Sequence, residues 1–238
     1  MLNLFKSNHL KDDFYQRNKL DLKWEPYLNI GALLLEYNQK RDSLTLKSRL
    51  QPQDLAALLG SAWDIFDAAS CKQLLNELLT LPNQHQHAAY INAILLHKIN
   101  VHPLAYSVLV SPGKLFSCLE KNCPAIFTKT EYPFDRIRFD GIGNVAAWDL
   151  ERAGLICRYA YNTGWLTHAE TVAYLKKLYE LALHYYDHWA DYYIAYMKAR
   201  TLFFEEKETE YIDYIFTLRH LYDHTAFMCT TYPITKYK

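Results

Sequence analysis

The chain has 238 residues, enough to bury a full core as one large domain or two small ones. Its 26 Lys and Arg residues balance its 26 Asp and Glu residues, and its 5 cysteines are scattered. The charge balance excludes a global attraction to nucleic acid, anionic membranes or acidic substrates, and an odd number of scattered cysteines does not indicate a disulfide framework.

The N-terminus has no continuous apolar stretch and runs into the charged residues Lys11, Asp12 and Asp13, which is not the pattern of a secretory signal. The longest apolar runs, such as Ala32–Leu35 and Tyr192–Met197, fall far short of the roughly 20 residues that a membrane-spanning helix needs. We therefore expect a reduced, cytoplasmic protein that contacts neither membranes nor nucleic acid.

Only 7 Gly and 8 Pro favour helices over a turn-rich β fold. Helical periodicity of the apolar residues predicts four helices in the N-terminal part, at about 29–40, 53–59, 68–81 and 84–99. Pro52 suits the first turn of the second helix, and Gly60 should end it. Asp67 should cap the third helix, which Pro82 should close.

Residues 101–143 differ, because prolines and glycines punctuate them and only a short helix at about 114–121 is expected. Their apolar content, which includes Phe116, Phe127 and Phe139, is too high for a free linker. We expect this irregular segment to pack across the core.

The C-terminal part carries clearer helix signals. A helix from about 144 to 161 should end at Gly164, and Thr167 with Glu170 forms a capping box that begins the next helix. The apolar period of this second helix persists to about residue 203, so a bend near Asp187 is expected. A charged boundary at 205–210 precedes a final helix at about 211–227.

These patterns predict an all-α protein, a single globular multi-helix domain over residues 1–238 with an irregular middle segment punctuated by Pro and Gly. Its parts are an N-terminal helical part at about 1–100, the packed segment at 101–143 and a C-terminal helical part at about 144–228.

One cluster of polar and aromatic residues is the candidate site. Trp189, Tyr193, Tyr196 and Arg200 recur at i, i+4, i+7 and i+11, so they share one helical side. Burial of the aromatic rings should take the Arg200 guanidinium inward, where it needs a carboxylate.

Asp149, which lies in the same run as Trp148 and Arg152, is the expected partner of Arg200. Arg152 should compete with Arg200 for the Asp149 carboxylate. The cluster is then either an internal salt-bridge network that fixes the register of the helices or a pocket that grips an anionic or planar ligand. We favour the network.

No catalytic residue, metal or cofactor is predicted, since the motifs of phosphate loops, nucleophile elbows and zincins are absent. The pairs His184/His188 and His220/His224 have the i,i+4 spacing of metal ligands, but both lie away from the apolar stripes and should face solvent. Cys118 and Cys123 lack the second pair that a zinc site needs.

Several motifs together point to a known family. They are Ala147–Arg152, Arg158–Gly164, Leu166–Glu170, the pair His188 and Trp189 with Tyr196 and Arg200, and upstream Leu59–Ile65. With this set, residues 55–205 resemble the DUF1266 family, a bacterial family of unknown function. The chain departs from the family pattern at Lys198 and Ala199, where a glycine is expected, and after Asn83, where a Gly-His pair is expected. The resemblance implies a bacterial source and an all-helical domain, but no reaction, cofactor or catalytic residue.

Two functions fit these observations. The first is a non-enzymatic protein that interacts with, or neutralises, another protein in the manner of an immunity protein. The alternative is a small-molecule-binding protein or enzyme that uses Asp149, Arg152, Arg200 and the tyrosines. The balanced charge and the lack of a catalytic constellation favour the first, with a protein as the partner.

Overall fold

The computed structural model describes residues 13–39, 43–87, 113–122, 126–127, 132–203 and 208–223. Every regular element in these ranges is a helix. In chain order they are α1 (Asp13–Asn18), the 3-10 helix η2 (Glu25–Asn29), α2 (Ala32–Gln39), α3 (Pro52–Trp63), α4 (Ala68–Leu78), helical residues 82–87 and 113–122, α7 (Arg136–Gly141), α8 (Ala146–Thr163), α9 (His168–Tyr185), α10 (Trp189–Phe203) and α11 (Glu208–Asp223). The prediction of an all-helical single domain is confirmed.

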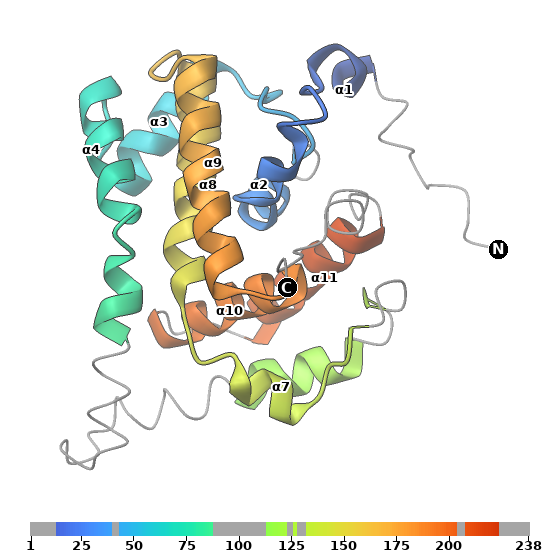
Figure 1. Ribbon diagram of the computed structural model, residues 1–238. Helices are drawn as coiled ribbons and strands as arrows, with labels where there is room; N and C mark the ends of the chain where they lie inside the picture. The colour runs from blue at the N-terminus through green and yellow to red at the C-terminus, as the bar shows by residue number, and fades with distance from the viewer. Residues whose placement is uncertain are drawn as a thin grey trace.

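Helix α8 is the centre of the fold. It contacts α2, α3, α4, α9 and α10, and Figure 1 shows α8 and α9 together in the middle of the molecule, between α4 and α2. From residue 146 to residue 160 every side chain except that of Arg152 is buried. A helix enclosed on all sides is expected to be apolar all round. Instead α8 carries Asp149, Glu151 and Arg158, each exposed by 1% or less.

The caps that the sequence predicts are confirmed. Asp67 accepts a hydrogen bond from the Ser70 N–H and forms a capping box for α4. Thr167 and Glu170 form the second box, at the start of α9. Gly164 ends α8 with φ 81°, a left-handed conformation that glycine adopts at little cost.

Three predicted helix boundaries differ from the structure. Helix α3 runs through Gly60 to Trp63, because a glycine inside a helix costs only about 1 kcal/mol and Asp64 ends the helix with φ 54°. Pro82 begins the next helical stretch rather than closing the previous one, and the predicted part beyond residue 87 lies outside the described residues. The predicted bend near Asp187 is a full break between α9 and α10, where the His188 Nδ1 accepts from the Ala190 N–H.

The described residues of the middle segment join the core. Residues 113–122 are helical, and Leu115, Leu119 and Phe139 are at most 1% exposed. The unpredicted helix α7 is capped by Asp135, whose carboxylate accepts from the Arg138 N–H. The domain limits given from the sequence stay a prediction.

An ionic contact ties α7 to α10. The Arg138 guanidinium donates from Nε and Nη2 to the Asp191 carboxylate at 2.9 and 2.6 Å, and the Tyr132 hydroxyl donates to the same carboxylate at 2.5 Å. The Lys198 ammonium donates to the Phe139 and Ile142 carbonyls at the end of α7, both at 2.7 Å. These contacts hold the middle segment against the C-terminal helices.

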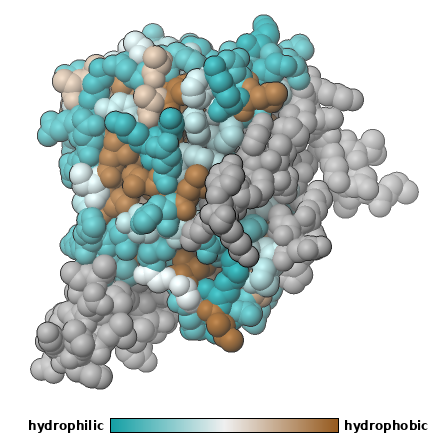
Figure 2. Space-filling view, in the orientation of Figure 1, coloured by the Kyte–Doolittle hydropathy of each residue, from teal (hydrophilic) through white to brown (hydrophobic). Residues whose placement is uncertain are grey.

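The surface seen in Figure 2 is mainly hydrophilic, with hydrophobic residues gathered between α4 and α9 and at the edge formed by α7. Among the described residues no helix combines the length and apolar character needed to cross a membrane.

Two glycines set the distance between α2 and α8. Gly31 has φ 80°, and a Cβ added to it would lie 2.6 Å from the Gly154 carbonyl carbon. A Cβ on Gly154 would lie 2.6 Å from the Gly31 nitrogen. Both contacts are with backbone atoms, which cannot move aside as a flexible side chain can. The start of α2 therefore touches the α8 backbone directly.

We predict that Gly154→Ala destabilises the protein by about 1–3 kcal/mol or more, because the added methyl group meets the backbone at Gly31. Gly141→Ala is the matched control, since a Cβ there has nothing within 4 Å, and it should change stability by less than about 0.5 kcal/mol. Urea denaturation gives both values. Equal stabilities for the two variants would contradict the close crossing.

Candidate functional site

A cleft of about 580 Å³ opens between α2, α3, α8, α10 and α11. Its lining is largely aromatic and aliphatic, with two arginines: Leu34, Tyr37, Asn38, Leu50, Leu58, Ala62, Trp63, Trp148, Arg152, Leu155, Tyr159, Tyr196, Arg200 and Tyr214. The volume lies within the range of ordinary ligand sites. The cleft brings four of the predicted site residues together: Trp148, Arg152, Tyr196 and Arg200.

One side of α8 forms the wall of the cleft. Trp148, Arg152, Leu155 and Tyr159 stand at i, i+4, i+7 and i+11, which is the spacing of one helical side. The wall is therefore fixed by the most enclosed helix of the protein.

Arg152 lies close to two indole rings. Its guanidinium carbon lies 4.8 Å from the centre of the Trp63 ring and 5.1 Å from that of Trp148. The Asp149 carboxylate lies behind it, with Oδ1 3.8 Å from Nη1. Burial lowers the pKa of Arg152, and the Asp149 charge opposes that shift. An arginine nevertheless stays protonated in proteins, so the cleft wall carries a positive charge.

Arg200 supplies the second positive charge. Its guanidinium carbon lies 4.9 Å from the Tyr214 ring centre and 6.0 Å from that of Trp148, and Nη1 lies 3.5 Å from the Tyr196 hydroxyl. Burial raises the pKa of Tyr196 to about 12, although Arg200 opposes the shift. Tyr196 is therefore neutral near pH 7 and is not a general base there.

The broad faces of several rings are covered by protein. Tyr37 stacks on Tyr214 with ring centres 4.1 Å apart and an interplanar angle of 3°. Tyr196 stacks on Trp148 at 5.3 Å and 23°. One face of each of these four rings is therefore covered by another ring.

The expected pairing of Asp149 with Arg200 is wrong. The Asp149 carboxylate accepts from the Asn83 backbone N–H at 3.0 Å and from the Asn83 side-chain amide at 2.5 Å, and its cationic neighbour is Arg152. The helical stretch that starts at Pro82 needs acceptors for its first N–H groups, and Asp149 supplies one. Arg200 is half-buried at the cleft, so burial of its aromatic neighbours did not take it into the core.

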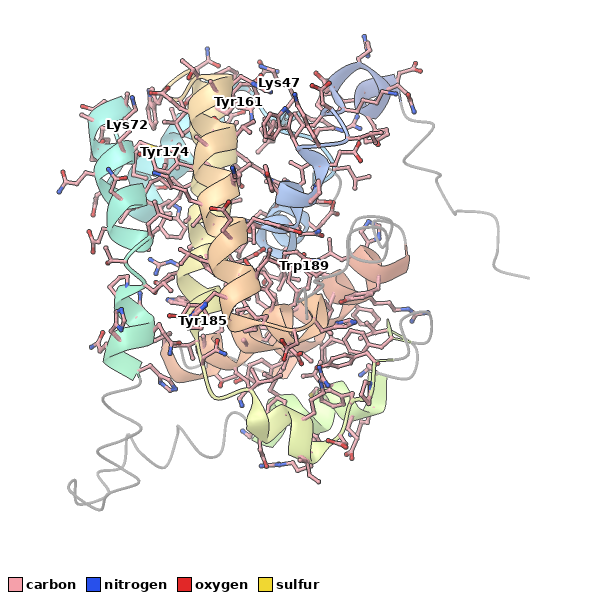
Figure 3. The ribbon with its side chains drawn as sticks, viewed as in Figure 1. Lys47, Lys72, Tyr161, Tyr174, Tyr185 and Trp189 are labelled. Atoms are coloured by element: carbon pink, nitrogen blue, oxygen red, sulfur yellow. The ribbon has the colours of Figure 1, made fainter. Side chains whose placement is uncertain are left out.

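The four residues predicted to share one side of α10 fall into two groups. Tyr196 and Arg200 reach the cleft, whereas Trp189 and Tyr193 pack more deeply and do not line it. The Tyr193 hydroxyl donates to the Asn29 carbonyl at 3.0 Å, and Trp189, labelled in Figure 3, packs 5.9 Å from the Tyr179 ring. These two residues hold η2 and α9 on α10.

Two important residues were missed. The Glu151 carboxylate accepts from the Gly31 N–H at 2.9 Å, the Leu34 N–H at 3.1 Å and the Tyr192 hydroxyl at 2.6 Å. Burial raises the pKa of Glu151, and these hydrogen bonds oppose the shift. Spacing alone gave no signal for Glu151, since α8 carries charged residues on several of its sides and only the packing shows which of them are buried.

Arg158 is the second missed residue. Its guanidinium donates to the Ser43 carbonyl at 2.7 Å and to the Leu28 carbonyl. Burial lowers the pKa of Arg158 to about 10, while the Glu151 charge opposes the shift. Glu151 therefore holds the backbone at the start of α2, and Arg158 holds the backbone of η2 and of Ser43.

The prediction that both histidine pairs face solvent is wrong in part. His184 is exposed, but His188 is half-buried with its ring 4.8 Å from that of Tyr132, and burial lowers the pKa of His188. The half-buried His220 lies with Nε2 3.5 Å from the Glu36 carboxylate, and His224 is outside the described residues.

Potential metal ligands and thiols are dispersed in the described part. It holds no group of three or more His, Cys, Asp or Glu side chains arranged to bind a metal ion. Cys71 and Cys157 are free and buried, Cys118 is buried, and Cys123 and Cys229 fall outside the described ranges.

Comparison with known proteins gives a family but no activity. A sequence model of the family described as "Protein of unknown function (DUF1266)" matches residues 58–232, more than half of the chain. Uncharacterized protein YbeU of Escherichia coli (strain K12) is 34% identical over 70 residues, which are 29% of this chain and 29% of YbeU. The matched region thus spans less than a third of that relative. No solved structure matches the chain.

A double-mutant cycle tests the revised pairing. Asp149→Ala should destabilise the protein by about 3–5 kcal/mol, because it removes the carboxylate beside Arg152 and an acceptor of the Asn83 N–H. The double variant Asp149→Ala/Arg152→Met should lose less stability than the sum of the two single losses, since the two side chains are neighbours.

In the double variant Asp149→Ala/Arg200→Met, the two losses of stability should add within about 0.5 kcal/mol. Urea denaturation of the single and double variants gives the coupling energies. A coupling energy between Asp149 and Arg200 as large as that between Asp149 and Arg152 would contradict the revised pairing and support the pairing of Asp149 with Arg200.

Proposed function

The chain belongs to the DUF1266 family, and we propose that it is a non-enzymatic binding protein whose cleft holds an anionic group attached to an apolar body. The observation that carries the proposal is the pair Arg152 and Arg200, whose guanidinium carbons both lie within 6.0 Å of the Trp148 ring on the wall of a 580 Å³ cleft. Guanidinium groups bind carboxylate, sulfonate and phosphate oxygens through charge-assisted hydrogen bonds.

The remaining lining supports an apolar body on the ligand. Leucines, alanine and aromatic rings form most of it, and the two arginines are the charged residues among the described residues of the lining. The nearest carboxylate to Arg152, that of Asp149, is buried behind the wall and accepts from Asn83.

Binding is favoured over catalysis by the side chains at hand. The described lining contains no His, Cys, Ser, Thr or Lys, the usual nucleophiles and general bases, and the raised pKa of Tyr196 keeps that hydroxyl protonated. The free thiols of Cys71 and Cys157 support the cytoplasmic location expected from the sequence.

Two sources of the anionic group remain. One is a partner protein, as in the partner-neutralising function predicted from the sequence, and the other is a small organic anion. The exposed side chains of Leu50 and Leu58 in the lining, at 38% and 42%, favour the partner protein, because a second protein could cover them.

The proposal predicts that 8-anilinonaphthalene-1-sulfonate, an anion on an apolar body, binds the folded protein with one-to-one stoichiometry. Arg200→Met should weaken this binding by about tenfold or more, because it removes one of the two charges in the cleft. N-phenyl-1-naphthylamine, its uncharged analogue, should lose less than about twofold on the same substitution.

Isothermal titration gives both affinities, and Lys176→Met is the matched control, because it removes an exposed charge from α9, which does not line the cleft. The absence of sulfonate binding, or an equal loss in Arg200→Met and Lys176→Met, would refute the proposal.

A further inference from the structure

The turn between α9 and α10 holds a histidine that caps a helix. The His188 carbonyl accepts the first backbone hydrogen bond of α10, from the Tyr192 N–H at 3.2 Å, and the His188 Nδ1 accepts from the Ala190 N–H at 2.9 Å. These two bonds define an N-cap, the position at which a side-chain acceptor satisfies an N–H group of the first turn. The acceptor at this cap is an imidazole nitrogen, which titrates near neutral pH.

The cap forms in one protonation state of the histidine. A ring nitrogen that accepts a hydrogen bond carries no proton, so the neutral His188 ring holds its proton on Nε2. Protonation of Nδ1 removes the acceptor from the Ala190 N–H. It also places a positive charge at the N-terminus of α10, where the helix dipole favours a negative one. The side chains that cap α4 and α9, Asp67 and Thr167, do not change protonation between pH 5.5 and pH 7.

The surroundings of the imidazole favour its neutral form. The half-buried ring lies 4.8 Å from the ring of Tyr132. Two charged groups act on it, Arg138 of α7 and Asp191 of α10, and the exposed Asp187 precedes it in the chain. Burial lowers the pKa of His188, Asp191 opposes this shift, and Arg138 adds to it. Near pH 7 the capping form is therefore the stable one.

The first turn of α10 also holds the middle segment. Asp191, the third residue of α10, accepts from the Arg138 guanidinium at 2.9 and 2.6 Å and from the Tyr132 hydroxyl at 2.5 Å. The cap at Ala190 is adjacent to this carboxylate in the chain. Loss of the cap therefore loosens the turn to which α7 and Tyr132 are attached.

We propose that His188 is an acid-sensitive cap, whose protonation releases the first turn of α10 and weakens the attachment of Tyr132 and Arg138 to Asp191. A histidine in an open or unfolded chain takes up its proton near about pH 6.5. Because the pKa of His188 is lower in the closed fold, the open form binds more protons once the pH falls below that value. The stabilising contribution of the cap is therefore complete above about pH 6.5 and is lost as the pH falls below it. This device acts apart from the cleft and its ligand.

The test measures the hydrogen exchange of single backbone amides by NMR on the full chain, at about pH 7 and about pH 5.5, with each rate corrected for the intrinsic effect of pH. The Ala190 amide reports on the cap. The Ser70 amide is the internal control, because Asp67 caps it and the hydrogen bonds from Ser70 hold the pKa of Asp67 below its usual value. His188→Asn keeps a capping acceptor that does not titrate, and His184→Asn, the matched control, removes an exposed histidine from α9.

We expect the protection of the Ala190 amide to fall by about threefold to tenfold from pH 7 to pH 5.5 in the wild type and in His184→Asn, since a pH one unit below the histidine pKa of the open chain gives at most about tenfold. In His188→Asn this protection should change by less than about twofold, as should that of the Ser70 amide in every sample.

The nitrogen spectrum of the wild-type imidazole is the second measurement, and it requires no variant to fold. It should place the His188 proton on Nε2 at pH 7. A proton on Nδ1 at that pH, an unchanged protection of the Ala190 amide in the wild type, or an equal fall in His188→Asn would overturn the inference.

Discussion

The fold depends on one constraint: α8 is buried from residue 146 to residue 160, except at Arg152, and yet carries charged groups that must find partners inside the protein. Glu151 meets the constraint by accepting hydrogen bonds from Gly31 and Leu34, at the start of α2, where the helix dipole favours a negative charge. The backbone amides and the Tyr192 hydroxyl replace the water that the carboxylate has lost. A charge from one helix therefore caps another that is far away in the sequence.

The cleft follows from this arrangement. Because Glu151 and the contact of Gly31 with Gly154 hold the start of α2 against α8, Leu34 and Tyr37 are brought to the side of α8 that carries Trp148 and Arg152. Arg158 binds the backbone at Ser43. The buried charges of α8 thus place the arginine-bearing wall of the cleft, so stability and the proposed binding site have a common origin.

Local signals in the sequence predicted much of the fold. The caps at Asp67, Thr167 and Gly164 depend on neighbouring residues, and the apolar periods of α8, α9 and α10 were long enough to identify. The candidate site was found only in part, because spacing shows which residues share a helical side but not which helix packs against that side. Trp148, Arg152, Tyr196 and Arg200 meet as expected, whereas the partner of Asp149 is Asn83, a contact that depends on how the helices are placed. Trp63 and Tyr214 could not be assigned to the cleft without that placement.

The most direct test of the account is the free energy of unfolding of Glu151→Ala, measured by urea denaturation beside Glu180→Ala. Glu180 is an exposed partner of Lys176, so its removal should change stability little. Removal of the Glu151 carboxylate leaves the Gly31 and Leu34 amides buried without their acceptor and takes a charge from beside Arg158, so the account predicts a loss of about 3–5 kcal/mol. A loss below about 1 kcal/mol, indistinguishable from that of Glu180→Ala, would contradict the claim that the buried charges of α8 organise the fold.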